Sequence, residues 1–84
     1  MIIYKYSLSG SGTTKIELKH PFQVLTVQLQ NNIPHMWAAI DPDGPEVVIK
    51  VSELYTGINY RTLTNYIGTT QDREGFVSHF YFET

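Results

Sequence analysis

The sequence contains no cysteine, and it is sparing with charged residues. Of its 84 residues, 17% are Asp, Glu, Lys or Arg, while 42% are hydrophobic. Without cysteine, disulfides and thiolate metal sites are excluded. The three histidines, His20, His35 and His79, show no metal-ligand spacing, so neither a metal nor another cofactor is expected. Small domains without such supports often gain stability from a partner subunit, so a homo-oligomer, a dimer or higher, is expected.

Positive charge is also scarce. Six Lys and Arg residues against eight Asp and Glu residues give a net charge of −2, and no basic patch suited to a phosphate backbone is visible. Duplex nucleic acid is therefore not an expected partner. Residues 1–6 lack the charged leader and long apolar run of a secretory signal. No apolar stretch has the length that a bilayer requires, so no membrane partner and a cytoplasmic location are expected.

Hydrophobic residues recur with a period of two, which is typical of β-strands. Strands are predicted at 2–6, 14–18, 25–30, 36–40, 47–51, 66–70 and 76–82, with residues 54–57 extending the fifth strand after a bulge near Ser52. One short helical turn is predicted within 58–65. The chain is therefore predicted to be a single all-β domain, residues 1–84: a small antiparallel meander of six to seven strands that forms a sandwich or barrel.

The strongest local pattern is a hairpin over residues 23–41. Leu25, Val27 and Leu29 alternate with polar residues, and Asn31-Asn32 tolerates the left-handed backbone of a tight turn. The next strand, 36–40, is apolar on both faces, which predicts a central strand or one that meets a partner.

The segments around this hairpin are predicted from their turn residues and their position. Asp41 begins a turn cluster, and residues 7–12, with Ser9-Gly10-Ser11-Gly12 at their centre, are predicted to be a flexible loop. The last strand, 76–82, is aromatic on both faces. It is predicted to be a sheet edge, where an identical chain could pair about a two-fold axis.

Several segments together resemble a family of short phage and prophage proteins that carry a domain of unknown function. The matching segments are 27–31 (VQLQN), Pro34, Trp37-Ala38, 41–43 (DPD), Thr56-Gly57, 66–69 (YIGT), Gln71 and 76–80 (FVSHF). The chain departs from the pattern at 9–12, and at Ile58-Asn59, where the family usually has a histidine and a proline. The resemblance implies phage origin, and hence the cytoplasm of a host cell, but it implies no activity.

Trp37 has two interpretations. A large aromatic residue often anchors a core, and it can also be a stacking platform for a base. Gln28 and Gln30 on the preceding strand are either solvated sheet surface or hydrogen-bonding groups for a ligand, since an amide offers both donor and acceptor. His79 in the last strand is interpreted as an interface or core residue, because no paired carboxylate or nucleophile is evident.

The most site-like cluster is Tyr55, Asn59, Tyr60 and Arg61. Aromatic rings, an amide and one guanidinium in a short irregular segment can stack a base and pair with a phosphate. An ordinary loop with solvated side chains is the alternative.

No nucleophile–base motif and no phosphate-binding loop is present, so the chain is predicted not to be an enzyme. The expected function is that of a non-catalytic phage protein that counters host defence. It would sequester a nucleotide-type immune signal in an oligomer, or block a defence protein. A structural or assembly role in the phage is one alternative, and a small enzyme that cleaves a cyclic nucleotide through His79 or His35 is another.

Overall fold

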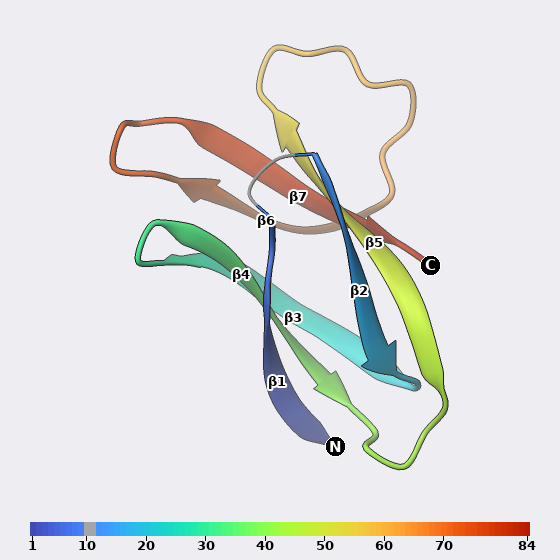
Figure 1. Cartoon of the computed structure of the whole chain (residues 1–84). Coiled ribbons are helices and arrows are strands. Elements are labelled where there is room, and N and C mark those ends of the chain that lie inside the picture. The colour runs from blue at the N-terminus through green and yellow to red at the C-terminus, as the bar shows by residue number, and fades with distance from the viewer. Residues whose placement is uncertain (10–11) are drawn as a thin grey trace.

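The computed structural model describes residues 1–9 and 12–84, and these form two stacked antiparallel sheets with no helix (Figure 1). The seven strands of the described residues are β1 (Ile2–Ser7), β2 (Thr13–Lys19), β3 (Phe22–Gln30), β4 (Ile33–Ile40), β5 (Glu46–Tyr55), β6 (Asn65–Gln71) and β7 (Val77–Glu83). One sheet has the order β1-β4-β3 and the other the order β2-β5-β7-β6. The predicted all-β sandwich is confirmed.

The connectivity is more crossed than a simple meander. Only β3–β4 and β6–β7 are hairpins between neighbouring strands, whereas the chain changes sheet between β1 and β2, β2 and β3, and β4 and β5. Residues 10 and 11 of the predicted Ser/Gly loop lie outside the described residues. The segment 56–64 forms no helix, so the predicted helical turn is wrong; it leaves β5 as a long loop at one end of the sandwich (Figure 1).

The predicted hairpin is confirmed as β3 and β4, which pair from Phe22–Ile40 to Gln30–Ile33. Asn31 and Asn32 have φ of 53° and 64°, the positive values that a two-residue hairpin turn of this kind requires. The strand β4 is central in its sheet, as its apolar sequence predicts. Its even-numbered residues face the other sheet, and Met36 and Ala38 are fully buried there.

The core lies between the sheets and is made of alternate residues from all layers. Its buried hydrophobic members are Leu8, Ile16, Leu18, Val27, Met36, Ala38, Ile40, Ile49, Val51 and Phe80. Phe80 is 1% exposed in this core, and its strand β7 lies between β5 and β6. The prediction that the last strand is an edge is therefore wrong, since β5 and β6 pair with β7 on its two sides.

The two long sides of the sandwich differ. On one side β3 and β6 lie close together, and a β-carbon built on Gly68 would stand 2.9 Å from Cγ1 of Val27. On the other side, between β1 and β2, a groove of about 310 Å³ remains open to solvent, with Tyr4, Tyr6 and Leu18 among the residues that line it.

Residues 41–45 form a hydrogen-bonded turn at one end of the sandwich. The Asp43 amide donates to Oδ1 of Asp41 over 3.0 Å, and the Gly44 amide donates to the Asp41 carbonyl over 3.1 Å. The interpretation of Asp41 as a turn-initiating residue is confirmed. His20 and Pro21, joined by a cis peptide bond, bind the same turn through the carbonyl oxygen of Pro45 and the amide of Asp41.

Candidate functional site

Trp37 lies on the solvent-facing side of the three-stranded sheet, not in the core. It is half-buried and is absent from the core cluster, while its neighbours Met36 and Ala38 point inward. The interpretation of Trp37 as a core anchor is therefore wrong. The sequence 36–40 is apolar on both faces, so pattern alone does not show which face is covered.

The residues that surround Trp37 come from all three strands. Lys5 of β1 and Thr26 of β3 stand opposite Trp37 in the register, and His35 stands opposite Gln28. The His35 and Trp37 rings are 6.3 Å apart at a tilt of 52°. We call this surface the Trp37 face, and it comprises Ile3, Lys5, Leu25, Thr26, Gln28, Gln30, His35 and Trp37.

A shallow pocket of about 330 Å³ lies on the Trp37 face and is lined by Ile3, Leu25, Thr26, Gln28 and Trp37. Leu25 belongs to this pocket because β3 has a bulge between Val24 and Thr26, which changes the alternation of the strand. Beside the pocket, Lys5 Nζ donates a 2.6 Å hydrogen bond to Oε1 of Gln30. An indole, two amides and one ammonium group thus meet on one exposed surface.

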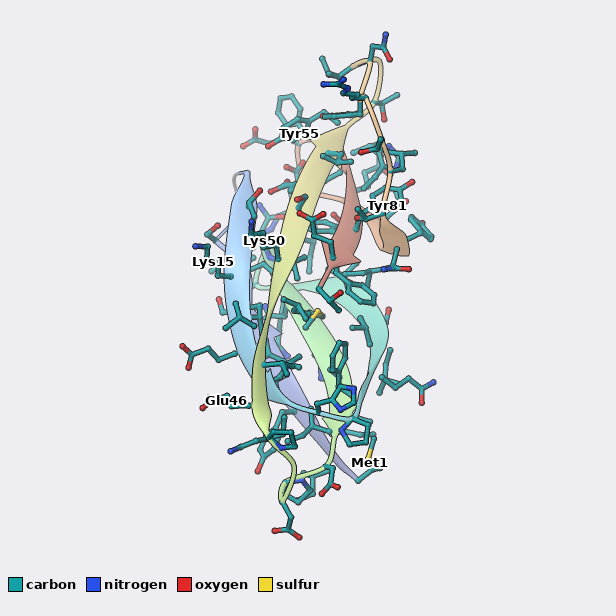
Figure 2. The ribbon with its side chains drawn as sticks, turned by 90° about the vertical axis from the view of Figure 1, so that its right-hand side faces the viewer. Met1, Lys15, Glu46, Lys50, Tyr55 and Tyr81 are labelled. Atoms are coloured by element: carbon teal, nitrogen blue, oxygen red, sulfur yellow. The ribbon has the colours of Figure 1, made fainter. Side chains whose placement is uncertain are left out.

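The second predicted cluster is only partly assembled, and it lies on the other sheet. The Tyr55 amide donates to the Tyr60 hydroxyl oxygen over 2.8 Å, and both tyrosines line a cleft of about 250 Å³. The other lining residues are Leu54, Thr56, Leu63, His79 and Tyr81, and we call this the His79 cleft. Figure 2 shows Tyr55 and Tyr81 toward the same end of the sandwich. Asn59 and Arg61 are exposed on segment 56–64 and do not line the cleft.

His79 is held by hydroxyl groups on both sides of its ring. Nε2 lies 2.8 Å from Oγ1 of Thr56, and Nδ1 lies 3.0 Å from Oγ1 of Thr69. The Tyr66 hydroxyl continues this chain at 2.7 Å from the same Thr69 oxygen. Such an arrangement fixes the imidazole in one orientation, but the carboxylates of the described residues form no hydrogen bond to it.

A third cavity, of about 340 Å³, lies at one end of the sandwich and contains a feature that the sequence does not reveal. There the Ser78 hydroxyl donates a 2.6 Å hydrogen bond to Oε2 of Glu53. The other carboxylate oxygen of Glu53, Oε1, is buried and has no hydrogen-bond partner. Within the residues that the structure describes, no group of three His, Asp or Glu side chains is arranged to hold a metal.

Sequence reasoning also missed Lys5 as part of the Trp37 face. Alternation within residues 2–6 puts Ile3 and Lys5 on the same face. However, the pairing of β1 with β4, about thirty residues away, brings that face beside Trp37. A non-local pairing of this kind leaves no signal in either strand alone.

The comparison with known families covers the complete chain: residues 1–84 match DUF7352, a domain of unknown function. The chain belongs to the DUF7352 family. The resemblance to an uncharacterised family is thereby confirmed. Searches of the curated proteins and of the solved structures return no match. The described residues contain no helix that is long and apolar enough to cross a membrane.

Proposed function

We propose that this DUF7352 domain is a non-catalytic binding protein that holds a nucleotide-type molecule on the Trp37 face. The observation that carries the proposal is the position of Trp37 at the centre of a solvent-facing sheet surface. Gln28 and the hydrogen-bonded pair of Lys5 and Gln30 lie on the strands to either side. A half-buried indole on the solvent-facing side of the sheet is not part of the core, which the opposite face of the same strand already supplies.

Each part of the Trp37 face matches one part of a nucleotide. The indole offers a flat apolar surface on which a base can stack, and such stacking contributes roughly 1–3 kcal/mol per base. Gln28 and Gln30 offer donors and acceptors to the edge of the base. The Lys5 ammonium lies at the border of the pocket, where it can pair with a phosphate. Because Lys5 is the one lysine or arginine among the residues of the Trp37 face, a ligand of low negative charge fits best.

The biological role that we propose is sequestration of a nucleotide-type immune signal by a phage protein in the cytoplasm of the host. The resemblance to short phage and prophage proteins supports this setting. Sequestration needs binding without turnover, and the environment of His79 supports that requirement. Both ring nitrogens have threonine hydroxyl partners, so neither is paired with a carboxylate of the kind that orients a catalytic histidine. In the alternative form of this role, the same surface would block a host defence protein.

The second candidate function is a structural or assembly role, and one observation favours it. Met1 and the first three residues of the edge strand β1, Ile2, Ile3 and Tyr4, are apolar and exposed. Such an edge is suited to joining copies of the protein. Purified virions that contain the chain, or polymers without a closed subunit number, would favour assembly over sequestration.

Trp37 is the only tryptophan, so its fluorescence reports ligand contact without a label. We expect a nucleotide from a panel of mononucleotides, dinucleotides and cyclic forms to quench this fluorescence and to raise the melting temperature. The ligand should stabilise the fold by about 2.7 kcal/mol at a hundredfold excess over its Kd. Mass spectrometry of the ligand recovered after denaturation should find it intact.

Three variants distinguish the site from its alternatives by thermal stabilisation. Trp37→Phe should retain much of the binding, because an aromatic face for stacking is kept, whereas Trp37→Leu should lose it. Tyr60→Phe, in the His79 cleft, is the matched control and should bind as the unmodified chain does. Stabilisation that survives Trp37→Leu but not Tyr60→Phe would move the site to the His79 cleft, and the absence of any response to the panel would refute nucleotide binding.

A further inference from the structure

The strand β1 is an exposed edge with an unusually apolar surface. It is the outer strand of the three-stranded sheet, so one row of its backbone amides and carbonyls has no strand beside it. The exposed fractions of Met1, Ile2, Ile3 and Tyr4 are 70%, 43%, 59% and 48%. An edge of this kind is a template for another strand, because pairing would satisfy the backbone and cover the side chains together.

The other three edge strands carry features that oppose pairing. The register of β3 shifts at a bulge between Val24 and Thr26, and that of β6 shifts between Tyr66 and Gly68. The edge strand β2 carries Lys15, Glu17 and Lys19 on its exposed face. In contrast, β1 pairs with β4 in an unbroken register from Ile2 to Ser7 and contains one charged residue. Charges and bulges both protect an edge. Each of the other edges has one of these protections, a bulge in β3 and β6 or three charged residues in β2, whereas β1 has no bulge and a single charge.

We propose that β1 pairs with β1 of a second copy, antiparallel and centred on Tyr4, to give a two-fold dimer with one continuous six-stranded sheet. In an antiparallel pair, opposite residues point to the same face of the sheet. A two-fold axis perpendicular to the sheet therefore pairs residues of the same parity, so it must pass beside Ile3, Tyr4 or Lys5 in the middle of the strand.

Charge selects the register centred on Tyr4. A pairing centred on Lys5 would set the two ammonium groups directly opposite one another, and like charges in that position are unfavourable. A pairing centred on Ile3 would use fewer residues of the strand. With Tyr4 at the centre, Lys5 stands opposite Ile3 of the partner subunit, and Ile2 stands opposite Tyr6 of the partner subunit. Both contacts cover exposed apolar surface.

The charges that line the groove beside β1 also favour the approach of a second copy. Its charged lining residues are two cations, Lys5 and Lys19, and two carboxylates, Glu17 and Glu46. A surface that carries both signs in equal number is suited to meeting itself, because no net charge opposes the approach.

The dimer would place two Trp37 faces on the same side of one sheet. This follows because the axis is perpendicular to the sheet, and Ile3, which lines the Trp37 pocket, lies beside the axis in each copy. Formation of the dimer requires no ligand, because its contacts come from the edge strand β1. The number of subunits in solution therefore tests it separately from nucleotide binding.

Sedimentation equilibrium of the full chain, without ligand, tests the dimer and its register. We expect the unmodified protein to be dimeric. Ile3→Lys sets a new ammonium opposite Lys5 of the partner subunit at two symmetric positions, and should weaken association roughly tenfold. Ile3→Glu sets a carboxylate at the same positions and should keep or tighten the dimer. Ile58→Lys is the matched control, because Ile58 is also 59% exposed but lies on segment 56–64.

A second measurement needs no substitution. Amide hydrogen exchange of the unmodified chain should show that protection of the β1 amides rises with protein concentration, while that of β2 amides does not. A monomer at every concentration would overturn the dimer. So would a dimer that Ile3→Lys leaves unchanged while circular dichroism shows a folded variant. Equal weakening by Ile3→Lys and Ile3→Glu would overturn the register centred on Tyr4.

Discussion

Gly44 packs directly against the backbone carbonyl oxygen of His20, and no space remains for a β-carbon at residue 44. The contact joins the turn after β4 to the turn between β2 and β3, and a hydrogen bond from the His20 amide to the Pro45 carbonyl, 2.8 Å long, holds the same two segments together. Any side chain at this position must push backbone away from backbone.

Gly44→Ala should therefore lower the free energy of unfolding by about 3 kcal/mol, as overpacking against rigid atoms does. Gly57→Ala is the control. Gly57 has φ of 86° but no atom near its absent β-carbon, so only the backbone strain of about 1 kcal/mol applies. Urea unfolding of both variants measures the difference. Equal losses would show that the turn at Gly44 moves freely aside.

The second prediction concerns the stability of variants in the turn between β3 and β4. Asn31 and Asn32 both have positive φ. Of the two side chains, only that of Asn32 bonds to another described residue, because its Oδ1 accepts a hydrogen bond from the Arg73 amide at 3.2 Å. Asn31→Ala should cost about 1 kcal/mol of stability through strain. Asn32→Ala should cost about 2 kcal/mol, because the bond is also lost. Asn32→Gly removes the bond without strain, and if it proves as stable as the unmodified chain in urea, the bond contributes nothing.

A third prediction concerns the pair of Ser78 and Glu53. Ser78 is buried and its hydroxyl is the one donor to the Glu53 carboxylate among the described residues. Ser78→Ala should cost about 2 kcal/mol, since a buried acceptor loses its remaining partner. A double-mutant cycle with Glu53→Gln, followed by urea unfolding, should show that Ser78→Ala costs less once the acceptor is an amide. Strictly additive losses would contradict the interaction.

The fourth prediction is a loss of stability in alkali. Burial raises the pKa of Tyr6 above its ordinary value of 10.0, and the nearby Tyr4 raises it further. Between the unfolded and folded pKa values the unfolded chain binds fewer protons, so the free energy of unfolding falls with rising pH. Stability should thus be constant below about pH 10 with respect to this group, and should decline above it.

Unfolding in urea at a series of pH values measures this decline, and Tyr6→Phe is the matched variant. The variant keeps the ring packed against the core but has no hydroxyl proton to lose, so its stability should fall less steeply in alkali. If both proteins lose stability with the same slope, Tyr6 does not cause the decline.

The sequence predicts those structural features that depend only on residues close to one another in the chain. The hairpin of β3 and β4 follows from alternation on both sides of Asn31-Asn32, and the turn at Asp41 follows from its own side chain. Strands β1, β2 and β6 follow from short runs of alternating or β-branched residues. These features need no knowledge of which strand lies beside which.

The errors arise where the partner of a strand is distant. Phe80 belongs to a central strand because β6 and β5 flank β7, which the order of the chain does not reveal. Trp37 lies outside the core because the second sheet covers the other face of β4. Arg61 lies apart from the Tyr55–Tyr60 pair because an irregular segment has no period that fixes the direction of its side chains. Of the predicted site residues, Trp37, Gln28 and Gln30 come together on one surface, beside Lys5.

The close approach of Gly68 to Val27 decides how the two layers can move. On the side of β3 and β6, the backbone of Gly68 in one sheet packs against the side chain of Val27 in the other. The two sheets cannot slide or separate there without losing this contact. When heat separates the two sheets, we therefore expect them to stay in contact on the side of β3 and β6 and to part first on the side of β1 and β2. We therefore expect water to reach the interior first at the open groove, beside Tyr6 and Leu18, and a molecule bound there to oppose the separation of the sheets.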